Sequence, residues 1–127
     1  MPGPARAGLS IYAKDQQRMA SFYQLVVGMS RIHDSSEVIV LQSTDIQFVI
    51  HRIPQNRVAG ITISAPPQLR DSALKFFFTV PSISAARSTA GELGGDVGFE
   101  QRQGPGLVVC NGNDPEEDVF HVRESVA

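Results

Sequence analysis

The pattern of apolar and polar residues predicts a strand and then a helix near the start of the chain. Residues 9–14 alternate between apolar and polar side chains, which is typical of a half-buried strand. Asp15 is a favourable helix N-cap, and Gly28 is a favourable stop. Between them, one helical face carries five apolar residues: Met19, Phe22, Tyr23, Val26 and Val27. Further strands are predicted after the helix, at 29–33, 37–42 and 45–52.

The second half of the chain repeats this order. Ser82 or Ser84 caps a helix that Gly94-Gly95 ends. Alternation and turn residues predict one strand before that helix and three after it, at 75–80, 97–102, 106–111 and 118–124. The helix-ending glycines Gly28 and Gly94 are 94 − 28 = 66 positions apart, about half of the 127 residues. A duplicated strand–helix–three-strand unit accounts for this spacing.

The repeat predicts an α+β fold in one domain over residues 1–127. The first βαβββ module is expected at 8–52 and the second at 74–124. Residues 53–73 are predicted to be a linker, because three prolines interrupt any regular pattern there: Pro54, Pro66 and Pro67. A chain of this length holds a core without disulfides or a structural metal.

Several short motifs resemble the vicinal oxygen chelate superfamily, which includes glyoxalase I, extradiol dioxygenases and bleomycin-resistance proteins. The first strand and helix, Ile11–Asp15 with Phe22-Tyr23, are similar to the family's module entry, and Phe78–Ile83 is similar to its second entry. Asp114-Pro115-Glu116 before Val119-Phe120-His121 is similar to its last turn and strand. Glu117-Asp118 replace the Gly-Asn that usually completes this turn. The resemblance implies two tandem modules whose mixed sheets curl around a central cleft.

Composition excludes several classes of function. Charged residues make up 19% of the chain and the net charge is −2, so no nucleic acid partner is expected. No apolar run approaches the ~20 residues that span a bilayer, and residues 1–8 lack the apolar core of a signal peptide, so we expect a cytoplasmic protein with no membrane partner. The single cysteine, Cys110, excludes a disulfide framework and is expected to be buried and inert.

Each predicted strand has one apolar face, expected to pack on a helix, and one mixed face. Mixed faces suit either solvent or a small-molecule site with an apolar wall and convergent polar groups. We predict the second use, because aromatic side chains occur among them. The candidate ligand-binding residues on these faces are Tyr12, Gln47, His51, Lys75, Phe77, His121 and Arg123. The cations among them face no assigned acidic strand residue, which favours an anionic ligand.

The resemblance implies a divalent metal held by His, Gln or Glu on four strands. The matching positions here are Gly8, Val49, Lys75 and His121. Only His121 has a suitable donor, and a protonated lysine repels a cation. We therefore predict no metal and no cofactor. A slipped alignment would offer His51 beside His121, a pair that still falls short of three ligands.

The resulting prediction is a metal-free protein that binds a small anionic or aromatic molecule, similar to the bleomycin-resistance branch, and the resemblance implies a homodimer. The alternative is a lyase, isomerase or dioxygenase of the same superfamily that uses His121 as general base or, with a metal, as ligand. A third hypothesis is a regulatory or vestigial module whose cleft is collapsed.

The acidic turn 116–118 is expected to be solvated, with nothing to shift its pKa values.

Overall fold

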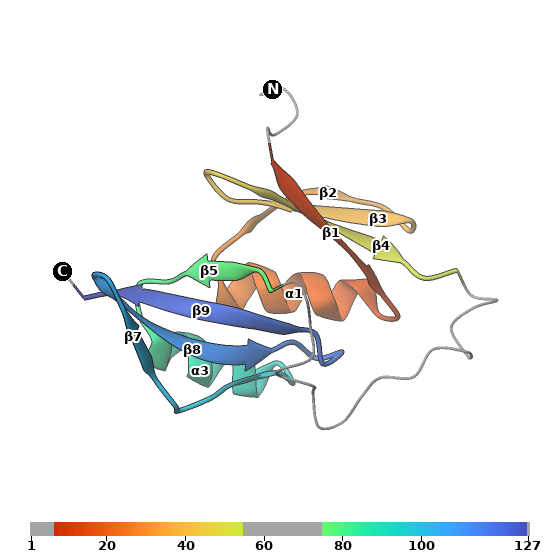
Figure 1. The fold of residues 1–127 in the computed structure, drawn as a ribbon. Coiled ribbons are helices and arrows are strands. Elements are labelled where there is room, and N and C mark those ends of the chain that lie inside the picture. The colour runs from red at the N-terminus through yellow and green to blue at the C-terminus, as the bar shows by residue number, and fades with distance from the viewer. Residues whose placement is uncertain (1–6, 55–74, 127) are drawn as a thin grey trace. The chain divides into compact units, whose positions relative to one another are not determined.

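The computed structural model describes residues 7–54 and 75–126, and the chain divides into two compact units, residues 1–62 and 63–127 (Figure 1). The predicted linker at 53–73 lies outside the described residues, except for Ile53 and Pro54.

The first unit is a strand, a helix and three more strands: β1 (Gly8–Ala13), α1 (Gln16–Val26), β2 (Ser30–Asp34), β3 (Val38–Gln42) and β4 (Gln47–Arg52). The sheet order is β1-β4-β3-β2. The first strand pairs with the last in parallel, and the other neighbours are antiparallel. A parallel pair needs a long connection, and here the helix and two strands supply it.

Helix α1 begins and ends as the sequence predicts. The Asp15 carboxylate accepts a hydrogen bond of 3.1 Å from the backbone N–H of Arg18, and Gly28 after the helix has φ +78°. The apolar face of the helix packs on the apolar face of the sheet, where the rings of Tyr23 and Phe48 lie 4.6 Å apart. Each large side chain buried in this way stabilises the fold by roughly 1.5–3 kcal/mol.

The second unit repeats this arrangement. Its elements are β5 (Phe77–Thr79), α3 (Ile83–Glu92), β6 (Asp96–Val97), β7 (Arg102–Gly104), β8 (Leu107–Asn113) and β9 (Val119–Ser125). The sheet runs β5-β9-β8-β6, and β7 also pairs with β8. Here too the first strand, β5, lies parallel to the last, β9. The described residues thus contain two helices and two mixed sheets, and the predicted α+β fold is confirmed.

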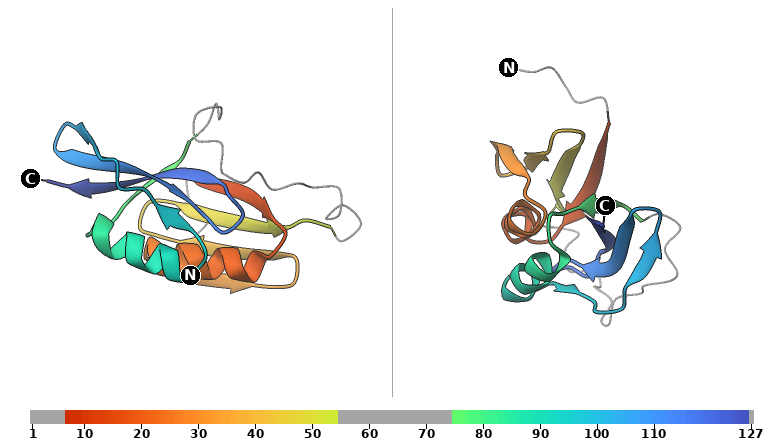
Figure 2. Two further views of the ribbon diagram at one scale, coloured as in Figure 1. Left: turned by 90° about the horizontal axis from the view of Figure 1, so that it is seen from below. Right: turned by 90° about the vertical axis from the view of Figure 1, so that its left-hand side faces the viewer.

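Helix α3 has two anchors at its start. The Ser82 hydroxyl accepts from the backbone N–H of Ala85 at 3.1 Å, and the Glu124 carboxylate accepts from the N–H of Ile83 at 2.6 Å. An acidic group at a helix N-terminus also complements the helix dipole. Gly94 has φ +90° after the last turn. Both helix-ending glycines therefore adopt the left-handed conformation that favours glycine. Figure 2 shows the helix and the sheet of each unit from two further sides.

The strand predicted at 97–102 is wrong, because the structure has two short strands, β6 and β7, in its place. The Arg87 guanidinium donates to the carbonyls of Val97 at 3.0 Å and Gly98 at 2.8 Å. It also stacks on the exposed ring of Phe99, 4.2 Å from the ring centroid. Arg87 thus occupies two carbonyl oxygens that a longer strand would use to accept hydrogen bonds from a neighbouring strand.

The turn before β9 also differs from expectation. Asp114 is fully buried, and its carboxylate accepts from the N–H groups of Glu116 at 2.9 Å and Asp118 at 3.1 Å. Burial raises the pKa of Asp118; a hydrogen bond with Asp114 opposes that rise, and the charge of Glu116 adds to it. The expectation of a solvated turn without pKa shifts is therefore wrong. Glu117 adopts φ +69°, the conformation that favours the glycine found there in the resembled family.

Candidate functional site

Three of the predicted ligand-binding residues lie on one sheet face of the first unit. Tyr12 of β1 is the register partner of His51 of β4, and their rings stack with centroids 4.8 Å apart and an interplanar angle of 20°. Tyr12 is 66% exposed. On the same strand as His51, the Gln47 side-chain amide donates to Gln42 Oε1 at 2.8 Å. The polar atoms of Gln47 are thus partly used within the sheet.

The other predicted residues lie in the second unit, on the face of β5 and β9. Phe77 is the register partner of His121, and the Arg123 guanidinium carbon lies 3.7 Å from the centroid of the Phe77 ring. This cation–π contact leaves Phe77 51% exposed. The Nε atom of Arg123 is buried and has no hydrogen-bond partner. The ring and the guanidinium together form a flat, positively charged surface.

The structure adds Arg102, which sequence reasoning missed. Arg102 of β7 pairs with Val109 of β8, which brings its side chain to the same face. Its Nη2 donates to Asn111 Oδ1 at 3.3 Å and lies 3.4 Å from His121 Nε2. The turn at Gly104–Gly106 was a usable signal. If the strands on either side of this turn pair as a hairpin, counting residues outward from the turn places residue 102 opposite residue 109.

Burial and neighbouring charges act together on His121. Partial burial lowers its pKa first, and the positive charges of Lys75, Arg102 and Arg123 lower it further. A guanidinium donates and never accepts, so the Nε2 atom facing Arg102 is the acceptor and Nδ1 carries the proton. The imidazole is therefore neutral near pH 7.

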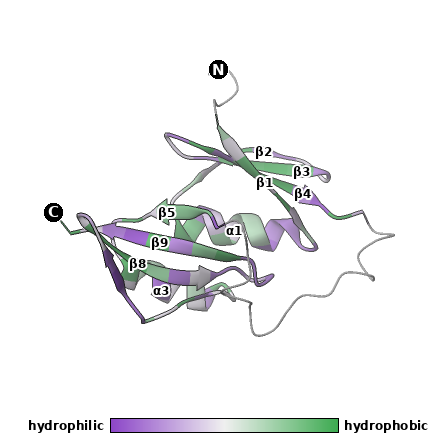
Figure 3. Cartoon of the chain, in the orientation of Figure 1, coloured by the Kyte–Doolittle hydropathy of each residue, from purple (hydrophilic) through white to green (hydrophobic). Residues whose placement is uncertain are grey.

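We call this surface the cationic face. It consists of residues from four elements and the segment before β5: Lys75, Phe77, Arg102, Asn111, His121 and Arg123. Figure 3 shows hydrophilic residues along β7 and between hydrophobic ones on β9. One acidic strand residue among the described residues shares this face: Asp96 of β6 pairs with Asn113 of β8, four positions along β8 from Val109, the partner of Arg102. Leu107 and Val109 of β8 add apolar side chains to the same face.

Comparison with known proteins identifies the fold. No family model matches the sequence, and no curated protein matches it. A solved glyoxalase/bleomycin resistance protein/dioxygenase family enzyme from Burkholderia phytofirmans PsJN matches 97% of this chain and 100% of its own, at 17% identity and a TM-score of 0.69. The chain has the glyoxalase/bleomycin resistance/dioxygenase fold. This is the fold of the vicinal oxygen chelate superfamily that the sequence motifs resemble, so the predicted fold is confirmed.

Two further structures share the glyoxalase/bleomycin resistance/dioxygenase fold. A glyoxalase/bleomycin resistance protein from Albidiferax ferrireducens T118 is 14% identical over 93% of this chain and 96% of its own, with a TM-score of 0.65. Lactoylglutathione lyase from Agrobacterium tumefaciens is 16% identical over 98% and 96%, with a TM-score of 0.58. At such identities the likeness concerns the fold, and it carries no activity to this chain.

The divalent metal implied by the resemblance does not fit the residues at the corresponding positions. A Cβ atom built on Gly8 would lie 2.9 Å from the backbone oxygen of Gln47, so a larger ligand there requires a shifted backbone. Val49 has no donor, Lys75 is cationic, and the Nε2 lone pair of His121 faces Arg102. Within residues 7–54 and 75–126, no three His, Cys, Asp or Glu side chains are grouped to hold a metal.

The remaining sequence candidates are structural. Cys110 is buried in β8, as predicted, with Arg87 Nη2 3.8 Å from its sulfur. His33 is exposed on β2, also as predicted. Neither α1 nor α3, the helices in the described part of the chain, has the length and apolar character needed to cross a bilayer.

Proposed function

We propose that this protein binds an anionic aromatic small molecule on the cationic face, without a metal ion. The observation that supports this most is the gathering of Lys75, Arg102 and Arg123 around a neutral His121. Like charges held together repel one another, and an anion relieves that repulsion. Charge-assisted hydrogen bonds to the two guanidinium groups supply the affinity.

The aromatic part of the ligand follows from Phe77. Its half-exposed ring already carries the Arg123 guanidinium at 3.7 Å, so a planar ligand finds an aromatic edge and a flat cation side by side. Carboxylate, phosphate and phenolate groups share the required charge. Benzoate is the simplest probe that combines a planar ring with a carboxylate.

Calorimetry with benzoate tests the proposal, and benzyl alcohol serves as the uncharged comparison. We expect saturable binding of benzoate only. Arg102→Gln should weaken it about tenfold or more, since a hydrogen bond to a charged group contributes roughly 1.5–3 kcal/mol. Arg102→Lys keeps the charge and should weaken it less. Arg18→Gln changes an exposed arginine of α1, in the other unit, and should have no effect.

Two results would contradict the proposal: benzoate that fails to saturate, or benzyl alcohol that binds as tightly as benzoate. Tyr12, Gln47 and His51 of the first unit remain predicted ligand contacts. Tyr12→Ala, measured in the same titration, tests that prediction without altering the cationic face. An unchanged affinity would remove Tyr12 from the ligand site.

A second candidate function is acid–base catalysis by His121, as in a lyase, isomerase or dioxygenase of the same superfamily. The specific support is the lowered pKa, which leaves the imidazole neutral and able to accept a proton near pH 7. Deuterium exchange at the α-carbon of aromatic hydroxyketones in D2O, followed by proton NMR, tests it. Exchange that His121→Gln abolishes would favour the enzyme, and exchange unaffected by that change would exclude this role.

A further inference from the structure

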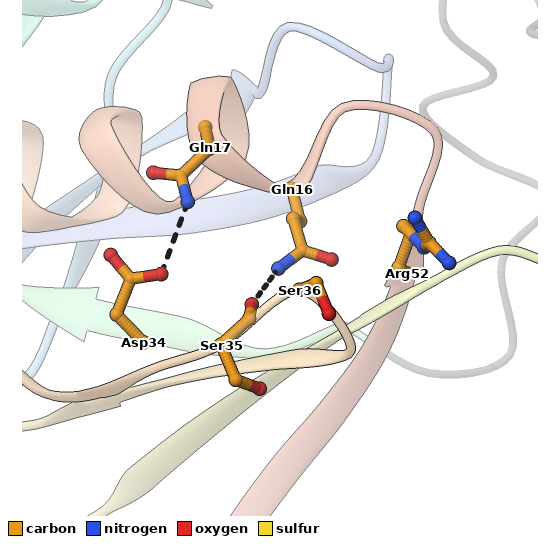
Figure 4. A pocket seen from close by; sticks show the side chains of 6 residues that line it. All are labelled: Gln16, Gln17, Asp34, Ser35, Ser36 and Arg52. Atoms are coloured by element: carbon orange, nitrogen blue, oxygen red, sulfur yellow. Dashed lines mark hydrogen bonds between the residues drawn. The ribbon is translucent and has the colours of Figure 1, made fainter.

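A second polar site lies in the first unit and shares no residue with the cationic face. It is a surface pocket of about 410 Å³ at the start of α1, the turn between β2 and β3, and the end of β4. Figure 4 shows its lining: Gln16, Gln17, Asp34, Ser35, Ser36 and Arg52. All of these residues belong to one unit, so the pocket is complete within it.

Gln16 presents a buried acceptor to this pocket. The residue is only 6% exposed, and its Nε2 donates to the backbone oxygen of Ser35 at 2.8 Å. Because that carbonyl can only accept, the amide cannot be flipped, and Oε1 must point away from Ser35. Gln16 Oε1 is buried without a hydrogen-bond partner. In Figure 4 this oxygen points to the side on which Arg52 lies.

Arg52 presents the complementary donor. Its Nε atom is buried and has no hydrogen-bond partner, and its Nη2 lies 3.5 Å from the exposed carboxylate of Glu37. Buried polar groups in proteins are nearly always paired, so each orphan requires an explanation. An acceptor and a donor left without partners beside the same pocket are the pattern expected of a site that a ligand completes.

Gln17 and Asp34, two other polar residues of the pocket, are already engaged. Gln17 Nε2 donates to Asp34 Oδ1 at 3.1 Å, and Arg31 donates to Gln17 Oε1 at 2.8 Å and to Asp34 Oδ2 at 2.9 Å. Asp34 is therefore already neutralised by an arginine and offers little attraction to a cation. Selectivity in this pocket rests on Gln16 and Arg52.

We infer that this pocket binds a neutral planar group with an N–H donor beside an oxygen or ring-nitrogen acceptor, that is, a carboxamide or lactam. Such a group donates to Gln16 Oε1 and accepts from Arg52 Nε–H at once. A carboxylate cannot donate to Gln16, and an ammonium group is repelled by Arg52. Both orphan atoms are covered from water, so binding includes a small movement of the Arg52 side chain, which is 36% exposed.

Nitrogen-15 NMR of the whole chain tests this directly. The side-chain amide of Gln16 and the Nε–H of Arg52 give signals in different regions of the spectrum, so both can be followed in one titration. Benzamide, benzoate and benzylamine are matched probes with one ring and a different polar group. We expect benzamide to shift both signals saturably and benzylamine to leave them unchanged. Benzoate should act on the cationic face and not on these two signals, so the failure of either proposal is distinguishable from failure of the other.

Three variants complete the test. Gln16→Met and Arg52→Lys each remove one of the two groups and should weaken benzamide binding at least fivefold. Gln101→Met changes an exposed glutamine of the second unit, outside the pocket, and should not. If Gln16→Met does not fold, Arg52→Lys decides. The inference is overturned if benzamide gives no saturable shift, if benzoate shifts these signals equally, or if a crystal grown with benzamide shows only an ordered water between Gln16 and Arg52.

Discussion

Arg102 Nη2 lies 3.4 Å from Nε2 of His121, a separation at which an unprotonated imidazole nitrogen can accept from the guanidinium and a protonated ring is repelled by it. Two antiparallel strand pairings create this relationship, since β7 and β9 flank β8 on either side. The protonation state of one residue therefore reports on the charge around the whole cationic face.

The first prediction concerns the pKa of His121. It should lie below the ordinary value of 6.5, because burial and three neighbouring cations disfavour the charged ring. Arg102→Gln removes one of those charges and should move the pKa back toward 6.5. Proton NMR of the imidazole across about pH 4.5–8 measures both values. An unchanged pKa in the variant would contradict the electrostatic contribution of Arg102.

The same shift has a consequence for stability. Because folding lowers the pKa of His121, this residue contributes stability above pH 6.5, and the contribution is lost as pH falls through the folded-state pKa. Urea unfolding of His121→Gln beside the native chain should show a smaller loss of stability over that interval. Equal losses in both proteins would assign the pH dependence to other groups.

Ligand binding and protonation should be linked. Protonated His121 adds a positive charge to the face, so benzoate should bind more tightly as pH falls through the His121 pKa. By reciprocity, saturating benzoate should raise that pKa. Calorimetry at several pH values measures the first effect, and NMR of the imidazole measures the second. His121→Gln should remove the pH dependence while retaining binding.

The fold was predictable from sequence because its signals are local. Asp15, Gly28, Ser82 and Gly94 mark helix ends through hydrogen bonds and backbone conformation within a few residues. The site was only partly predictable. Phe77, His121 and Arg123 share a face by simple alternation, but the position of Arg102 depends on which strand pairs with which.

Burial of polar groups was the other gap in prediction. Asp114 has the sequence context of an exposed turn, and only the tertiary structure shows it fully buried under its own hydrogen bonds. The unpartnered atoms of Gln16 and Arg52 are likewise invisible in sequence, because they result from packing between α1, β4 and a distant turn.

Purified protein should contain no divalent metal at the position that the resembled family uses. Gly8 has no room for a ligand side chain, and Val49 and Lys75 provide no suitable donor. Elemental analysis of protein purified without chelator or affinity tag measures this. Near-stoichiometric zinc, nickel, manganese or iron that His121→Gln removes would contradict the prediction and revive the metalloenzyme alternative.

Glu117→Gly should stabilise the fold by about 1 kcal/mol. Glu117 has φ +69°, a conformation that costs an L-residue energy and a glycine almost none. The gain exceeds the loss of a long contact of 3.5 Å from Asn113. Urea unfolding measures the change. Glu116→Gly is the matched control, since residue 116 has no positive φ, and it should destabilise the chain instead.

We expect a homodimer in solution, as the resemblance implies. In the described sheet of the first unit, β1 and β2 are edge strands, and exposed edges favour pairing with another chain. Sedimentation equilibrium of the full chain measures the mass. A single species of 13.8 kDa at micromolar concentration would contradict this expectation.

The parallel pairing of first and last strands governs how each unit forms during synthesis. Gly8 meets Gln47, made 39 residues later, and Phe77 meets His121, made 44 residues later. Each opening strand therefore leaves the ribosome long before its neighbour exists. Such distant pairings are slow to form. Until they form, the backbone N–H and C=O groups of the opening strand are unpaired, and a chaperone or a second copy of the chain can bind them.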